Sequence, residues 1–241
     1  MPSPIDNYRK MVEEPWGRMF YDQIFQQLVL PETPKKKILD FGAGFGITSA
    51  YYGKCHDVTA VEPSEEMRNL RVSGSYTLIP QGLDYLSTIA ENTYDIVLCH
   101  NVIEYVDNRN EILSRLVRVL KPGGILSIIK HNLLGRVMTM AVLPDDPKAA
   151  LDLLNETPET SMFGSRSVYS QADLESAFGD VMSLSKCYGI RAFFGLSSNN
   201  EVKYTEDWYK PMLELETRAS TMEEFRKVAF FNHLIYTKRE A

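Results

Sequence analysis

The sequence is poor in cysteine, and the few cysteines follow no recognisable pattern. Cys55, Cys99 and Cys187 lie far apart, and no C-x-x-C pair occurs. An odd, scattered set excludes a disulfide framework and a zinc knuckle. Such usage fits a reducing compartment, so the sequence predicts a cytoplasmic protein. No pair of histidines has metal-ligand spacing, so we expect no bound metal.

Long apolar runs and an excess of positive charge are also lacking. No stretch approaches the ~18 apolar residues of a membrane-spanning helix, so we expect no membrane insertion. The chain carries 26 Lys and Arg against 32 Asp and Glu, a net charge of −6. This balance disfavours a protein that coats nucleic acid non-specifically, but it allows an enzyme with a local basic patch.

The length and composition are those of a globular protein. Its 241 residues are 44% apolar and 24% charged, close to the average for globular proteins. We expect a single domain over residues 1–241. It would consist of an N-terminal arm and helix (1–35), a core (36–130), and a lid with late strands (131–241).

Strand and helix patterns alternate through the core. Strands are expected at Lys37–Phe41, Asp57–Val61, Tyr76–Ile79, Tyr94–Cys99 and Gly124–Lys130. Helical patterns lie between them at Ile47–Tyr52, Pro63–Arg71 and Asn110–Leu120. This alternation predicts βαβ units and therefore an α/β fold with a doubly wound, mostly parallel sheet. Ligands of such sheets bind outside the carboxyl ends of the strands.

The pattern is less regular outside the core. Residues 1–15 are polar and proline-containing, which indicates an arm, and 131–165 look like helices and loops. Further helices are expected at 16–30, Ser170–Phe178 and about 205–220, and two late strands at 180–188 and 227–238.

A glycine-rich turn follows the first expected strand. The segment Asp40–Gly46 reads D-F-G-A-G-F-G, and Ile47 stands where a dinucleotide fingerprint has its last glycine. Glu62 ends the second strand, sixteen residues after Gly46, where a carboxylate can accept both hydroxyls of a ribose. Together they predict an adenosine-containing ligand. The alternative is a loop that merely turns, with Glu62 in solvent.

The core resembles the class I S-adenosylmethionine-dependent methyltransferases. Four ordered segments carry the resemblance: D-F-G-A-G-F-G, V-T-A-V-E-P-S, Y-D-I-V-L-C-H-N-V-I-E-Y-V and L-K-P-G-G-I-L. It implies S-adenosylmethionine as cofactor and a Rossmann-like seven-stranded sheet in the order 3-2-1-4-5-7-6, with strand 7 antiparallel and helical lid insertions.

The resemblance also implies cofactor contacts. Gly42, Ala43 and Gly44 would approach the methionyl part, Asp40 would face its ammonium, and Glu62 would hold the ribose.

Two later positions are expected to complete the cofactor site. Leu83 and Asp84 follow the third strand, where the family contacts adenine, although the usual G-D-A is G-L-D here. His100 follows the fourth strand, and we expect it to contact the cofactor rather than to act as a general base. A packed histidine without a chemical role is the alternative. His131, after the fifth strand, is a candidate for facing the substrate.

The second half has its own resemblance, in H-N-L-L-G-R-V-M, Y-G-I-R-A-F-F and M-L-E-L-E-T-R. It is similar to the bacterial methyltransferases of the tRNA wobble base 5-carboxymethoxyuridine, which esterify a free carboxylate. This resemblance implies tRNA as partner and Arg18, in the N-terminal helix, as a further cofactor contact.

A carboxylate acceptor is ionised at neutral pH and needs no strong base. An arginine can clamp it through two parallel hydrogen bonds; Arg191 is the first candidate, with Arg136 and Arg218 behind it. Some aromatic residues of the lid either stack a splayed-out base or form the lid core: Phe193, Phe194, Trp208 and Tyr209.

Two other functions stay open: a methyltransferase of a small molecule, such as a carboxylic acid or quinone precursor, and a cofactor-binding module without transfer activity. The oligomeric state is also open.

Overall fold

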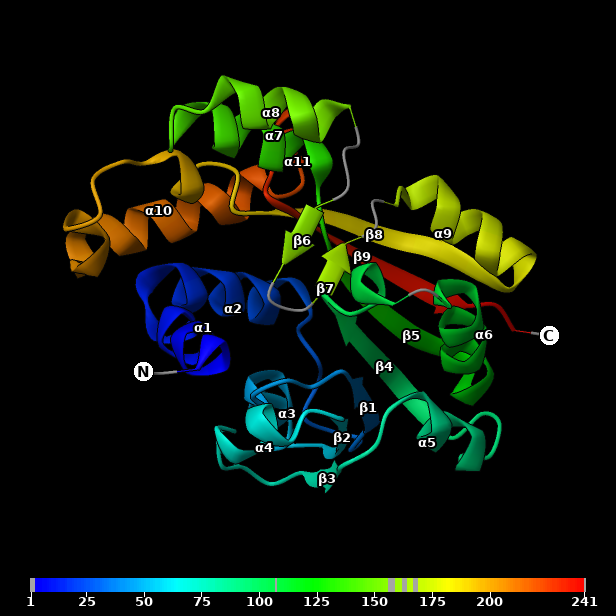
Figure 1. Cartoon of the computed structure of the whole chain (residues 1–241). Coiled ribbons are helices and arrows are strands. Elements are labelled where there is room, and N and C mark those ends of the chain that lie inside the picture. The colour runs from blue at the N-terminus through cyan, green and yellow to red at the C-terminus, as the bar shows by residue number, and fades with distance from the viewer. Residues whose placement is uncertain (1–2, 107, 156–158, 162–163, 167–168, 241) are drawn as a thin grey trace. The chain divides into compact units, whose positions relative to one another are not determined.

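A computed structural model describes residues 3–106, 108–155, 159–161, 164–166 and 169–240 (Figure 1). The chain divides into two compact units. Unit 1 comprises Met1–Val29, Lys130–Thr160 and Cys187–His233, and unit 2 comprises Leu30–Ile129, Ser161–Lys186 and Leu234–Ala241. Unit 2 therefore holds nearly all of the expected core, and unit 1 collects the N-terminal helices and most of the expected lid.

The main sheet has seven strands in the order β3-β2-β1-β4-β5-β9-β8. They are β1 (Lys37–Phe41), β2 (Asp57–Val61), β3 (Thr77–Ile79), β4 (Tyr94–His100), β5 (Leu120–His131), β8 (Met182–Ile190) and β9 (Phe231–Lys238). Numbered within this sheet, the order is 3-2-1-4-5-7-6, so the expected topology is confirmed. Strands β1 to β5 pair in parallel, with Leu39 beside Thr59 and Val97.

The central strands are buried almost along their whole length. Every residue of β1 after Lys37 is buried, and so is the run from Ile96 to Cys99 in β4. Continuous apolar strands of this kind are typical of a parallel sheet with both faces covered. Their carboxyl ends carry the glycine turn, Glu62 and His100.

The helices and turns of unit 2 follow its strands. They are α3 (Ile47–Tyr52), α4 (Glu65–Asn69), α5 (Leu83–Thr88), η1 (Ile103–Tyr105), α6 (Arg109–Val119), α9 (Gln171–Phe178) and η2 (Gly179–Val181). Helix α6 buries Ile112, Leu113, Leu116 and Val119 at helical spacing, as its amphipathic pattern predicts. Ser170 caps α9, as expected.

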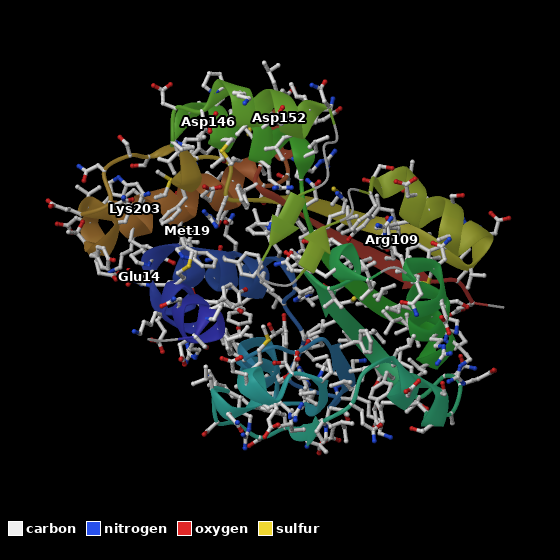
Figure 2. All side chains as sticks on the ribbon, viewed as in Figure 1. Glu14, Met19, Arg109, Asp146, Asp152 and Lys203 are labelled. Carbon is white, nitrogen blue, oxygen red and sulfur yellow. The ribbon has the colours of Figure 1, made fainter. Side chains whose placement is uncertain are left out.

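Unit 1 is mainly helical. Its elements include α1 (Pro4–Glu13), α2 (Pro15–Gln27), α7 (Leu133–Val142), α8 (Pro147–Leu154), η3 (Phe194–Leu196), η4 (Val202–Tyr204), α10 (Glu206–Ala219) and α11 (Glu223–Val228). Met19 on α2, which is labelled in Figure 2, forms a buried cluster with Phe194 and Tyr209. Phe194 and Tyr209 are therefore core residues, and their alternative role in stacking a base is wrong.

Two expectations about local structure are wrong. The N-terminal arm is instead helix α1, because Ser3 and Asp6 form a capping box and Pro4 occupies the first turn, where its missing N–H has no cost. Pro15 begins α2 in the same way. In the region expected as helices and loops, β6 (Glu159–Ser161) and β7 (Gly164–Arg166) form a two-stranded sheet.

Candidate functional site

The turn after β1 is shaped by its backbone. Gly42 and Gly44 have φ angles of 76° and 54°, in the left-handed region that favours glycine. The N–H groups of Gly42 and Ala43 both donate to the carbonyl of Val61, at 2.9 and 3.0 Å. A Cβ on Gly42 would lie 2.3 Å from the Val102 side chain, whereas a Cβ on Gly44 would meet nothing closer than 3.8 Å. The turn is thus tightly packed at Gly42, whereas an added Cβ at Gly44 would make only an ordinary contact with Met67.

Glu62 fastens this turn from the end of β2. Its side chain is buried, its Oε2 accepts the N–H of Gly44 at 2.8 Å, and its Oε1 accepts the N–H of Ser64 at 2.8 Å. The alternative of a solvated Glu62 is therefore wrong. Because each carboxylate oxygen has a second lone-pair site, Glu62 can hold the turn and still accept ligand hydroxyls.

Asp40 lies buried at the end of β1. Its Oδ2 accepts a hydrogen bond from the Ser49 hydroxyl at 2.6 Å. Desolvation raises the pKa of Asp40 to about 6; the Ser49 bond opposes this shift and the charge of Glu62 adds to it. The buried Asp40 carboxylate, with a second buried carboxylate at the end of the neighbouring strand, makes a site that favours a cationic ligand.

His100 ends β4 and faces a polar neighbour on β5. Its Nε2 lies 2.9 Å from the Ser127 hydroxyl, and burial lowers the pKa of His100 to about 3. The imidazole is therefore neutral at pH 7 and a weak base, which disfavours the general-base role. Its contact with the cofactor stays a prediction.

Leu83 and Asp84 occupy the first turn of α5, after β3. Leu83 is half-buried and Asp84 is exposed. Their contact with adenine stays a prediction.

Arg191 is the unusual residue of unit 1. It has a φ of 61°, and its N–H donates to Gln23 Oε1 at 3.0 Å. Its guanidinium lies 5.1 to 5.6 Å from the ring centroids of Phe230, Trp16 and Phe194. The Nε atom is buried and has no hydrogen-bond partner among the residues that the structure describes. Burial lowers the pKa of Arg191 to about 10, although Glu216 opposes the shift, so the group is charged at pH 7.

The turn after Arg191 is held by Glu216 on α10. This buried carboxylate accepts the N–H groups of Ala192, Phe193 and Phe194 at 2.7 to 2.9 Å. Its oxygens thus serve the backbone rather than the guanidinium. The three bonds fix the chain just after the strained φ of Arg191.

Unit 1 buries more positive than negative charge. Its described buried cations are Lys130, Arg136 and Lys203, whereas Glu216 is the buried carboxylate among its described residues. Lys203, labelled in Figure 2, donates to Ser197 O and Asn200 Oδ1, both uncharged.

The other residues singled out from the sequence differ in their surroundings. The His131 ring packs against Phe231, with ring centroids 4.6 Å apart. The Arg18 guanidinium pairs with Glu206 and lies 3.8 Å from the Tyr209 ring centroid. The cofactor contact of Arg18 and the substrate contact of His131 stay predictions.

Arg136 and Arg218, the two further candidates for the carboxylate clamp, differ in exposure. Arg136 is buried, whereas the Arg218 side chain is 77% exposed and pairs with Glu214. Arg218 is therefore a surface residue.

Sequence reasoning missed three polar residues that shape these sites: Ser49, Gln23 and Glu216. Ser49 lies on α3, nine residues after Asp40, and Gln23 lies on a helix recognised only by its apolar spacing. No local signal distinguishes them from other polar helix residues.

Within the described residues, no group of three or more His, Cys, Asp or Glu side chains is arranged to hold a metal. No described helix is long and apolar enough to cross a membrane.

Comparison with known proteins places the core in one family. Residues 39–128 match the family described as a methyltransferase domain. The chain is 25% identical over 228 residues to the tRNA 5-carboxymethoxyuridine methyltransferase of Escherichia coli K12, covering 86% of this chain and 82% of that protein.

Two other relatives agree on the core. The mitochondrial ubiquinone biosynthesis O-methyltransferase of Schizosaccharomyces pombe is 33% identical over 117 residues, 44% of this chain and 43% of that protein. A SAM-dependent methyltransferase of Archaeoglobus fulgidus has a similar structure, with a TM-score of 0.60 and 15% identity over 96% of this chain and all of that one. At 15% identity, the similarity to the Archaeoglobus fulgidus structure shows the fold alone.

Proposed function

Because this chain is a class I S-adenosylmethionine-dependent methyltransferase, we propose that it methylates a carboxylate, that of 5-carboxymethoxyuridine at the wobble position of tRNA. The observation that carries the proposal is Arg191, a charged guanidinium whose buried Nε has no acceptor among the described residues. A carboxylate is the planar anion that such a fork binds through two parallel hydrogen bonds.

The residues of unit 2 fit the cofactor. Gly44 has no side chain to block a close approach of the methionyl chain, and the buried Asp40 is suited to an ammonium group. Glu62 keeps lone-pair sites for the ribose hydroxyls while it holds the turn. We assign Leu83, Asp84 and His100 to the adenine side on the family resemblance.

Methyl transfer to an ionised carboxylate needs no general acid or base from the protein. S-adenosylmethionine supplies a methyl group activated by its sulfonium. An ionised carboxylate would accept this methyl group without losing a proton, so no residue of the chain would need to act as a base. A neutral His100 with a pKa of about 3 is consistent with a reaction that needs no base. The contribution of the chain is orientation of the oxygen and exclusion of water.

The relatives support a nucleoside acceptor over a quinone precursor. The Escherichia coli tRNA enzyme aligns with 86% of this chain, whereas the ubiquinone enzyme of Schizosaccharomyces pombe aligns with 44%. The longer match includes unit 1 segments, where Arg191 lies.

The test is transfer of a radiolabelled methyl group to bulk tRNA that contains 5-carboxymethoxyuridine, with tRNA lacking it as the negative substrate. Arg191→Lys should lose much of kcat/KM for the acceptor, because a point charge cannot replace a planar fork. Arg191→Ala should lose more, and both should keep wild-type affinity for S-adenosylmethionine.

Arg218→Ala is the matched control, since it removes an exposed arginine paired with Glu214. It should methylate normally. Equal incorporation by the Arg191 variants would refute the carboxylate clamp. Methylation of small carboxylic acids but not of either tRNA would transfer the activity to a small-molecule acceptor.

A further inference from the structure

Gln23 is a buried amide of which only the oxygen end has a hydrogen-bond partner among the described residues. It lies on α2 and is 1% exposed. Because the N–H of Arg191 is a donor, the atom of Gln23 that faces it at 3.0 Å must be the carbonyl oxygen. The Nε2 group is therefore the one without a partner among the described residues. A buried donor left unpaired is destabilising, so such a group calls for an explanation.

The next turn of the same helix provides a comparison. Gln27 lies four residues on, and therefore on the same face of α2. Its Nε2 donates to the carbonyl of Gly189 at 3.0 Å, and its Oε1 lies 2.8 Å from His233 Nδ1. Both ends of the Gln27 amide are thus satisfied within unit 1. Burial on this helix does not by itself leave a glutamine unpaired, so Gln23 differs for a local reason.

The local reason is its neighbour. Gln23 is hydrogen-bonded to the backbone of Arg191. Among the described residues of unit 1, the Nε of Arg191 is the other buried side-chain donor without a partner. Glu216, the buried carboxylate described nearby, is occupied by three backbone N–H groups. Two adjoining residues thus present donors for which the described chain supplies no acceptor. A group with two acceptor oxygens matches these donors, with one oxygen for each.

We propose that Gln23 is a second acceptor-binding residue, whose Nε2 donates to the carboxylate held by Arg191. The inference rests on the proposed function and deepens it. Arg191 supplies the positive charge, and the Gln23 amide donates to the second oxygen, so the pair favours an acceptor group with two oxygens. Methylation turns the carboxylate into a neutral ester, and its carbonyl oxygen still accepts from an amide. An uncharged second donor therefore binds the anion without leaving another uncompensated cation when the ester forms.

Gln23→Glu is the sharpest variant. The new carboxylate can still accept the N–H of Arg191, so the fold is retained. It replaces the free donor by an acceptor and places a negative charge beside the guanidinium. We expect kcat/KM for the acceptor to fall by at least about 100-fold, an unchanged Kd for S-adenosylmethionine, and an undiminished Tm. Gln23→Met, which removes both ends of the amide, should lose about 10-fold.

Gln27→Glu is the matched control. Its new oxygen would oppose the carbonyl of Gly189, so it should lower the Tm, in contrast to Gln23→Glu. The folded fraction should keep the wild-type KM for the acceptor. A decrease of kcat/KM in Gln23→Glu that is accompanied by the same loss of Tm as in Gln27→Glu would show a structural role and overturn the inference.

A binding experiment separates this inference from the proposed function. Sodium acetate is titrated into 15N-labelled protein against sodium chloride at equal ionic strength. The side-chain Nε2 resonance of Gln23 and the Nε resonance of Arg191 should shift with acetate alone, and Gln23→Glu should abolish the shift at Arg191. Shifts without methylation of tRNA would refute the proposed acceptor but support Gln23. Absence of a shift at Gln23, or normal methylation by Gln23→Glu, would overturn the inference while leaving the proposed function intact.

Discussion

Replacing Asp40 by asparagine should make the protein more stable and less able to bind its cofactor. The pKa of Asp40 is about 6 against a reference of 3.8, chiefly because of desolvation. Below about pH 3.8 the carboxyl is protonated in both the folded and the unfolded chain, so it contributes nothing to pH dependence. As the pH rises toward 6, the unfolded chain ionises first and the free energy of unfolding falls. Above pH 6 the carboxyl is ionised in both states, and the free energy of unfolding falls no further.

The magnitude follows from the shift. A change of one pKa unit corresponds to about 1.36 kcal/mol, so a pKa rising from 3.8 to about 6 removes at most about 3 kcal/mol at neutral pH. Asp40→Asn avoids this loss, and its amide oxygen can still accept the Ser49 hydroxyl. For a chain of this length, each kcal/mol moves Tm by roughly 2–4 °C. We expect a higher Tm for the variant at pH 7.5 and nearly equal values at pH 4.

The assay is thermal unfolding from pH 4 to 8, with and without S-adenosylmethionine. If the cofactor ammonium pairs with the ionised Asp40 carboxylate, as proposed, the cofactor should stabilise the wild type more than Asp40→Asn. Asp95→Asn is a control of opposite sign: burial acts to raise the pKa of Asp95, but hydrogen bonds from Lys121 and the Lys37 N–H outweigh it and lower the pKa. That variant should lose stability at neutral pH. A Tm difference between wild type and Asp40→Asn that does not vary with pH would refute the reasoning.

Three further predictions concern unit 2. Glu62→Ala should weaken cofactor binding by on the order of 2–4 kcal/mol in a folded protein, because charge-assisted hydrogen bonds to the ribose would be lost. Calorimetry measures the affinity for S-adenosylmethionine, with the exposed Glu65→Ala as control, and equal affinities of the two variants would exclude the ribose role. Gly44→Val should abolish cofactor binding, since the φ of 54° at this position disfavours side chains and the valine would block the approach expected for the methionyl group. Retained affinity would mean that the turn has another use. The pKa of His100 is about 3, so this side chain should not titrate between pH 5 and 8. Any inflection of the pH–rate profile in that range should therefore persist in His100→Gln. An inflection that disappears in this variant would contradict a neutral imidazole.

The cofactor half of the molecule was largely predictable from its sequence. Apolar strands, amphipathic helices and the ordered motifs are local patterns, and the right-handed crossover rule limits how they can be arranged. The turn from Gly42 to Gly44 and its partner Glu62 could be recognised because both follow strands, whose carboxyl ends meet at one edge. Local signals failed at the N-terminus, where the prolines begin helices rather than interrupt them.

By itself, then, the sequence determined the α/β class through its periodicity. Its short motifs, through the family resemblance that they carry, implied the sheet order, the cofactor class and the candidate arginine. Only the tertiary structure decided which polar groups are buried and which are paired. Gln23 and Arg191 meet across 168 residues of chain, and Glu216 joins the backbone of the segment after Arg191 from another helix. Burial and hydrogen-bond satisfaction depend on the whole surrounding of a side chain, which spacing along the chain does not specify.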